Sequence, residues 1–281
     1  MKTFILMLKG FIIGSSMSVP GVSGGTMAIL LGIYDRLISS ISHFTKDVKG
    51  NLLYLGKFLL GSLLGIGTLA FLISWLLEKF PLPVAFFFIG AVVGGIPAIY
   101  KKTRESKFGV SSAVYILIGL AIIVGIGFIP KGVFTVANGF GLSNIIMWLA
   151  GGIIIAVALV LPGISTSHML LVLGMYETTL AAIKSFDLAY ILFLALGVGI
   201  GVILTTRPLE WTMNKFPHQT YCIILGFVIG STGEIFKETI LPNIPQNADV
   251  VWWSLNIVIC LITFVLGIMG IMSLSRFAKD E

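Results

Sequence analysis

Two short turns rich in proline, glycine and polar side chains interrupt a chain that is otherwise mostly apolar. The first turn covers residues 20–26 (PGVSGGT) and the second covers residues 162–168 (PGISTSH). Proline and glycine interrupt a helix, and a helix that restarts after such a turn offers free N–H groups to an anion. Hydroxyl groups add hydrogen-bond donors. We therefore predict a binding site for an anionic group such as phosphate, with ligands from both turns: Pro20, Gly21, Ser23, Gly24, Gly25, Thr26, Pro162, Gly163, Ser165, Thr166, Ser167 and His168. The plainer alternative is that these small residues only let helices approach closely and that His168 is a packed polar residue.

One arginine stands inside an apolar segment. Arg207 precedes Lys215, where the segment ends, by eight residues. A charge inside a bilayer is costly and usually functional, and the arginine fork fits phosphate oxygens. We predict that Arg207 binds the phosphate and that Glu210, on the same helical face, either holds Arg207 or carries a proton. The alternative is that Pro208 ends the helix early and leaves Arg207 at the membrane surface.

Four acidic residues are candidates for coupling to protons or sodium ions: Glu210, Asp35, Glu177 and Glu234. Asp35 and Glu177 occupy equivalent positions after the two turns, and the alternative is that both lie at the membrane–water interface. Glu234 either pairs with Lys237 one helical turn away or titrates.

No motif for an enzyme or a resident cofactor is present. The sequence lacks a phosphate-binding P-loop, a Gly-x-Ser-x-Gly elbow and paired Cys/His spacing, and its loops are short. Its net charge of +6 comes without an aromatic–basic patch of the kind that binds nucleic acid. We expect neither catalysis, a cofactor, a metal nor a nucleic-acid partner, and nothing in the sequence indicates the oligomeric state.

The elements that must position these residues are membrane helices. Of the 281 residues, 57% are hydrophobic and 11% are charged, and the mean hydropathy is +1.06. Such a composition predicts an all-α polytopic protein with a single transmembrane domain over residues 1–281. Ten apolar stretches are visible: 4–19, 26–42, 53–77, 82–100, 110–130, 143–161, 167–184, 188–214, 219–240 and 250–275.

The chain repeats itself. The two turns match without a gap at an offset of 142 residues, and a second block matches at an offset of 136, where Lys79-Phe80-Pro81 pairs with Lys215-Phe216-Pro217. Two blocks in the same order, matched at Pro, Gly and Lys, make chance similarity a poor explanation. Internal repeats of this kind are typical of secondary transporters.

The stretches beside each turn are short for a membrane span of about 20 residues. We therefore predict a first repeat over residues 1–140, with a re-entrant hairpin at 4–42, and a second repeat over residues 141–281, with a hairpin at 143–184. Three transmembrane helices follow each hairpin, and the odd number of crossings makes the repeats inverted. The alternative is ten full spans.

Positive charges predict the orientation. With the N-terminus in the cytoplasm, 13 of the 18 Lys and Arg residues fall on the cytoplasmic side and 4 on the outer side. Because such residues are enriched on the cytoplasmic side, both termini are expected to be cytoplasmic.

Four pairs of glycines at a spacing of four residues predict close helix packing. They are Gly61 and Gly65, Gly90 and Gly94, Gly197 and Gly201, and Gly226 and Gly230.

The segment GSSMSVPGVSGGT at residues 14–26, followed by GIYD at 32–35, resembles the N-terminal signature of a bacterial membrane family. The segment LPGISTS at residues 161–167 is similar to its second signature. The family is that of the PopT-type polyprenyl-phosphate (undecaprenyl-phosphate) translocases, long known only as a domain of unknown function. The resemblance implies a protein of the bacterial cell membrane that returns the lipid carrier phosphate from the outer to the inner leaflet for cell-envelope synthesis. A transporter of a small soluble anion and a non-transporting membrane assembly factor are the alternatives.

Overall fold

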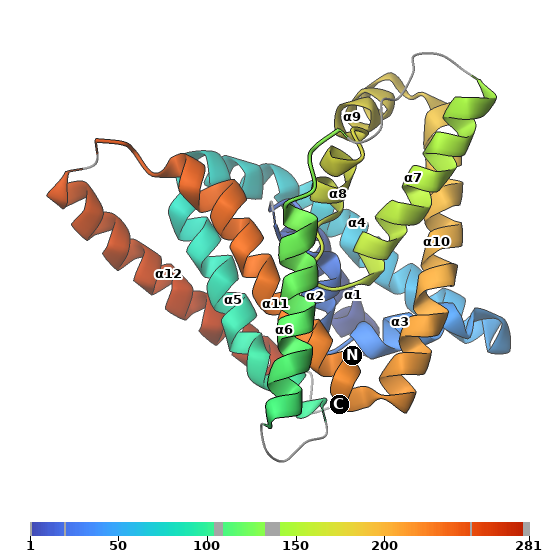
Figure 1. Cartoon of the computed structure of the whole chain (residues 1–281), viewed down its shortest axis with the longest axis horizontal. Coiled ribbons are helices and arrows are strands. Elements are labelled where there is room, and N and C mark those ends of the chain that lie inside the picture. The colour runs from blue at the N-terminus through green and yellow to red at the C-terminus, as the bar shows by residue number, and fades with distance from the viewer. Residues whose placement is uncertain (1, 20, 104–108, 133–140, 248, 278–281) are drawn as a thin grey trace.

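The computed structural model describes residues 2–277 except 20, 104–108, 133–140 and 248. The described residues are almost entirely helical and contain no strand, which confirms the all-α fold (Figure 1). In chain order the elements are α1 (Lys2–Ser16), α2 (Gly24–Leu30), α3 (Tyr34–Ser42), the 3₁₀ turn η1 (Phe44–Lys46), α4 (Val48–Lys79), α5 (Pro81–Lys101), α6 (Val110–Gly127), α7 (Leu142–Val160), α8 (Thr166–Val172), α9 (Tyr176–Ser185), α10 (Leu188–Lys215), α11 (Pro217–Ile235), the π-helical turn η2 (Phe236–Ile240), the 3₁₀ turn η3 (Leu241–Asn243) and α12 (Val250–Phe277).

Seven of the described helices are long and apolar enough to cross a membrane: α4, α5, α6, α7, α10, α11 with its continuation to Asn243, and α12. This confirms a multi-pass membrane protein. The helices that follow each turn are much shorter, with 7 and 9 residues in α2 and α3 and 7 and 10 in α8 and α9. A helix needs about 20 residues to cross the hydrocarbon core. Seven candidate spans among the described helices are fewer than the ten of the alternative. Because α7, the first limb of the second predicted hairpin, is one of the seven, the re-entrant hairpins stay a prediction.

Both hairpins contain a break that the sequence analysis did not predict. The expected stretches 26–42 and 167–184 are each divided by a glycine with positive φ, Gly32 at 72° and Gly174 at 70°. These two glycines are equivalent in the repeat, at the offset of 142. Glycine adopts this conformation without steric strain, so each returning limb bends after seven residues.

The glycine pairs predicted to be packing faces are all in close helix contacts, which confirms that prediction. Helix α1 packs on α4 and α7 packs on α10. A Cβ added to Gly61 would collide with the backbone of Met7, and one added to Gly197 would collide with the backbone of Leu149. At both places the backbones approach too closely for any side chain.

The second pair of glycine faces joins the two halves of the chain. Helix α12 packs along α5, and α6 packs along α11 (Figure 1). Cβ atoms added to Gly90 and Gly226 would collide with the backbones of Phe264 and Ile116. The last helix of each half therefore packs on the other half, and this duplicated pairing agrees with two structural repeats. Their opposite orientation in the membrane stays a prediction.

The two turns touch each other inside the bundle. The Gly163 N–H donates a hydrogen bond of 2.9 Å to the Thr26 hydroxyl, and the Tyr34 hydroxyl donates one of 2.8 Å to the Val160 carbonyl. An added Cβ on Gly25 would lie 3.2 Å from Pro162. Figure 1 shows α7 descending to this contact from the end of the bundle where α9 lies, while α1 begins near the opposite end.

Replacing Gly197 by leucine is expected to force α7 away from α10 and to lower the midpoint of thermal unfolding in detergent. Overpacking of this kind costs about 1–3 kcal/mol or more. The control is Gly199→Leu on the same helix, because a Cβ at Gly199 meets no atom within 4 Å. Equal midpoints for the two variants would contradict the close contact at Gly197.

Replacing Thr26 by valine keeps the shape of the side chain and removes the acceptor of the Gly163 N–H. A buried amide left without a partner costs about 1–3 kcal/mol, so the unfolding midpoint is expected to fall. Thr26→Ser retains the hydroxyl oxygen and should unfold near the wild-type midpoint. If the valine and serine variants unfold together, the hydrogen bond between the turns has no measurable role.

Candidate functional site

A cavity of about 250 Å³ lies beside the second turn. It is bounded by the second half of α6, by the second turn with α8, and by the end of α11 with η2. Its lining residues are Ile123, Val124, Ile126, Gly127, Phe128, Gly163, Ile164, His168, Gly230, Gly233, Glu234, Lys237 and Glu238. We call it the turn cavity. It combines apolar walls with a small group of ionisable side chains, which is the usual composition of a ligand site.

The deepest polar group of the turn cavity is His168. Its side chain is 7% exposed, and its Nδ1 lies 3.3 Å from Oε1 of Glu234, whose side chain is 13% exposed. Neither ring nitrogen makes a hydrogen bond of good geometry among the residues that the structure describes, and the Ile126 backbone interacts with the ring. The Ser165 hydroxyl, which caps α8, accepts a 3.4 Å hydrogen bond from the His168 backbone N–H and so helps to fix the position of this residue. A buried imidazole nitrogen that lacks a well-formed hydrogen bond is available to a ligand.

Lys237 lines the same cavity, and Lys131 pairs with Glu238, another of its lining residues. Lys237 donates a hydrogen bond of 3.0 Å to the Gly127 carbonyl, and Lys131 lies 3.7 Å from the Glu238 carboxylate. Lys237 and Glu238 belong to the π-helical turn η2, a distortion often found at functional sites. Glu234 forms its ion pair with His168, and no ion pair between Glu234 and Lys237 is present among the described residues, so that predicted alternative is not what the structure shows.

Of the twelve predicted turn residues, Gly163 and His168 line the cavity. Thr26, Gly25 and Pro162 take part in the contact between the turns instead. The other turn residues lie elsewhere. Gly21 packs against Ile235 and Gly24 against Met17, as Cβ atoms added to these glycines would show, and Ser23 is buried. Ser165 caps α8, Thr166 and Ser167 are partly exposed, and Pro20 lies outside the described residues. The open space is therefore beside the second turn and not shared equally by both.

Arg207 lies in a different hollow. It is exposed and borders a space of about 550 Å³ with Ser42, His43, Glu210, Trp211, Asn214 and Lys215. Helix α10 continues through Pro208 to Lys215, so the alternative in which Pro208 ends the helix is wrong. We call this space the α10 hollow. The structure does not bring Arg207 to the lining of the turn cavity.

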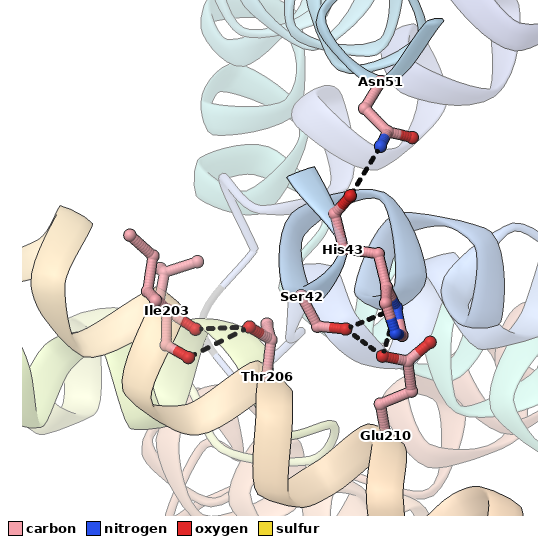
Figure 2. Close-up of polar contacts among 7 residues, drawn as sticks. Ser42, His43, Asn51, Ile203, Thr206 and Glu210 are labelled. Carbon is pink, nitrogen blue, oxygen red and sulfur yellow. Dashed lines mark hydrogen bonds and ion pairs between the residues drawn. The ribbon is translucent and has the colours of Figure 1, made fainter. Parts of the chain in front are cut away.

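Glu210 in the α10 hollow ties the first hairpin to α10 (Figure 2). The Ser42 hydroxyl donates to the Glu210 carboxylate, and Nδ1 of His43 lies 3.0 Å from the same carboxylate. The Asn51 amide donates a 3.1 Å hydrogen bond to the His43 carbonyl. Sequence reasoning missed His43 and Ser42, because Ser42 and Glu210 are 168 residues apart and no local pattern joins them.

The other two acidic candidates lie outside the turn cavity. Asp35 is half-exposed and accepts hydrogen bonds of 2.5 Å from Lys102 and 2.9 Å from the Tyr221 hydroxyl. These contacts join the first hairpin to the end of α5 and the start of α11. Glu177 is exposed on α9. Within the described ranges no cluster of three or more His, Cys, Asp or Glu side chains could hold a metal ion.

The first hairpin packs more closely on its surroundings than the second. Helix α3 packs on α10, but in the described chain the equivalent pair, α9 and α4, has no comparable contact. In the same way, α2 packs on α5 more extensively than α8 packs on α11. The turn cavity occupies the region that this looser packing leaves open.

The chain is similar to known proteins along most of its length. Residues 13–250 match the family described as undecaprenyl phosphate translocase-like. A curated relative from Staphylococcus aureus, called polyprenyl-phosphate transporter, is 34% identical over 99% of this chain and 98% of its own length. A relative of the same name from Vibrio cholerae is 32% identical over 87% of this chain and 82% of its own length. No solved structure matches. These matches confirm the resemblance seen in the two turn motifs: the chain belongs to the undecaprenyl phosphate translocase-like family.

Proposed function

We propose that this protein transports polyprenyl phosphate from the outer to the inner leaflet of the bacterial cell membrane, and that the turn cavity holds the phosphate head group. Family membership supports the lipid substrate. The observation that carries the location is the buried His168 at the end of a cavity that also contains Lys237. No catalysed reaction or cofactor is part of this proposal.

The chemistry of the turn cavity suits a phosphate. An anion moved from water into hydrocarbon loses its hydration, and the cost is large unless charged or polar groups replace the water. The imidazole of His168 and the ammonium group of Lys237 are N–H donors, and such charge-assisted hydrogen bonds are stronger than neutral ones. The neighbouring carboxylates of Glu234 and Glu238 balance the positive charge when the cavity is empty.

The turn cavity also suits a substrate with a long apolar tail. Cβ atoms added to Gly127 and Gly233 in its wall would meet no atom within 4 Å. Val124 and Phe128 in the same wall are 47% and 81% exposed. The side of the cavity between α6 and α11 is therefore open toward the apolar surface of the bundle. The isoprenoid tail can remain in lipid while the head group enters.

The packing asymmetry supports an assignment of the state that the structure represents. Lys131 and Lys237 lie on the predicted outer side, so the turn cavity faces the outer leaflet. The predicted cytoplasmic side is closed by the contacts of Ser42 and His43 with Glu210 and of Asp35 with Lys102. In the alternative state this side opens, and we propose that Arg207 then receives the head group.

The first experiment replaces Lys237 by glutamine. Loss of a charge-assisted hydrogen bond is expected to weaken head-group binding about tenfold to a hundredfold, and outer-leaflet undecaprenyl phosphate should accumulate in cells that depend on the variant. The measurement is the surface accessibility of that lipid. The control is Lys79→Gln, an exposed lysine paired with Glu78, which should behave as wild type.

Wild-type accessibility in the Lys237→Gln cells would remove the turn cavity from the mechanism. A parallel assay measures uptake of labelled inorganic phosphate by proteoliposomes. Uptake without any effect on the lipid would favour a transporter of a soluble anion.

The second experiment uses the repeat to predict the alternative state. The residues equivalent to Ser42 and Glu210 are Lys184, at the offset of 142, and Ser74, at the offset of 136. If α9 closes on α4 as α3 closes on α10, cysteines at Lys184 and Ser74 should cross-link only in the state that is open to the cytoplasm. Both native cysteines are first replaced by alanine.

The matched pair is Ser42→Cys with Glu210→Cys, which should cross-link without substrate. Substrate turnover is expected to increase the Lys184–Ser74 cross-link at the expense of the Ser42–Glu210 cross-link. If the Lys184–Ser74 cross-link never forms in active protein, the proposed exchange between two equivalent states is wrong.

A further inference from the structure

We propose that His168 and Glu234 form a proton-binding pair, which takes up one proton together with each phosphate head group and thereby couples transport to protons. The inference rests on the proposed function. It adds to that function the identity of the coupling ion and the two side chains that carry it.

The geometry of the pair supports this role. The His168 side chain is buried and that of Glu234 is partly buried, their nearest nitrogen and oxygen atoms are 3.3 Å apart, and both line the turn cavity. The two atoms lie at ion-pair distance but not in hydrogen-bond geometry, so a proton on the pair is carried by one group or the other. Nε2 of His168 makes no hydrogen bond of good geometry among the described residues, so it can donate to a ligand while Nδ1 faces the carboxylate.

The charges that face the pair come from few elements. Helix α6 contributes only apolar residues and glycine between Ile123 and Phe128, and the second turn contributes Gly163 and Ile164. The remaining ionisable groups are Lys237 and Glu238 on η2, with Lys131, which is paired with Glu238. Lys237 is held by the Gly127 carbonyl. Near the pair, one lysine and one paired carboxylate therefore surround the space that a head group would enter.

Electrostatics then determines the proton count. In the empty cavity one proton on the pair leaves it with no net charge, which is the least costly state for two groups shielded from water. A phosphate anion beside an ionised Glu234 would be repelled in a medium of low dielectric constant. A second proton, placed on Glu234, removes the repulsion and leaves His168 positively charged to donate to the phosphate. The loaded pair thus holds one proton more than the empty pair.

The same two residues differ from their equivalents in the first half of the internal repeat. The position equivalent to His168 in the first half is Thr26, and the position equivalent to Glu234 is Ala98. Thr26 accepts the hydrogen bond that joins the turns, and alanine cannot titrate. The first half therefore has no counterpart of the pair, although its backbone follows the same path through the turn.

The inference is tested by proton uptake on binding. The protein is placed in nanodiscs of phosphatidylethanolamine and phosphatidylglycerol and titrated with farnesyl phosphate. Calorimetry in two buffers of different ionisation enthalpy gives the number of protons bound. For wild type at pH 8 we expect about one proton per ligand, and an apparent Kd that rises with pH by up to about tenfold per unit, because the bound state holds more protons.

With His168 and Glu234 both replaced by glutamine, neither position can take up a proton. This double variant should bind farnesyl phosphate more weakly than wild type, without proton uptake and with a much flatter pH dependence. Glu78→Gln, at an exposed glutamate on α4, should match wild type. His168→Gln should bind at least about tenfold more weakly. Its thermal unfolding midpoint, if close to wild type, excludes misfolding as the reason.

The outcomes separate the inference from the proposed function. Binding without proton uptake in wild type, or full uptake in the variant with both residues replaced, would overturn the proton-binding pair and leave lipid transport intact. The second result would also follow if the phosphate itself took the proton, since its second pKa is near 6. Absence of farnesyl phosphate binding, or equal affinity for inorganic phosphate, would instead contradict the lipid phosphate site.

Discussion

The hydrogen bond from the Gly163 N–H to the Thr26 hydroxyl meets a requirement of any non-helical backbone inside a membrane, which is that its polar groups find hydrogen-bond partners within the protein. Lipid offers no hydrogen-bond partners, so a turn at that depth must be surrounded by protein or by a wet cavity. Each turn of this chain provides part of the surroundings of the other. The two turns can lie inside the bundle because they meet there.

The contact between the turns is held in place by the packing of the last helix of each half on the other half. Glycine faces bring α1 onto α4 and α7 onto α10, while α6 and α12 each pack on the other half. Membrane helices gain little from hydrophobic burial against each other, so close backbone approach is the main source of their attraction. The bundle around the turns is thus fixed by contacts that exclude side chains. The hairpin helices α3 and α9 lie outside these contacts and pack unequally.

Much of this arrangement could be predicted from particular residues. The turns are visible in the sequence from the proline and glycine of each one, and the helix contacts from the four glycine pairs and the repeat offsets. These features can be read locally because each one depends on the backbone geometry of a single segment. The breaks at Gly32 and Gly174 were missed, although both glycines were visible as matched positions. The partner of Glu234 was missed for a different reason. A lysine three residues away is an obvious candidate in sequence, but only the folded chain brings His168 from another hairpin to 3.3 Å. Contacts of Glu210 with Ser42 and His43 are equally invisible in the sequence.

The difference between the halves follows from their shared geometry. A turn that is fully enclosed satisfies its own backbone, and a turn that binds a substrate must leave polar groups exposed to it. One turn cannot do both at once. In this structure Thr26 and the first hairpin are enclosed, while the equivalent His168 faces a cavity. A transporter built from two equivalent hairpins can reverse this distribution by moving one hairpin inward as the other moves outward. The proposed proton-binding pair of His168 and Glu234 faces the cavity of one hairpin only, so on this proposal the two states differ in their affinity for protons, and a ligand can shift an equilibrium only through such a difference.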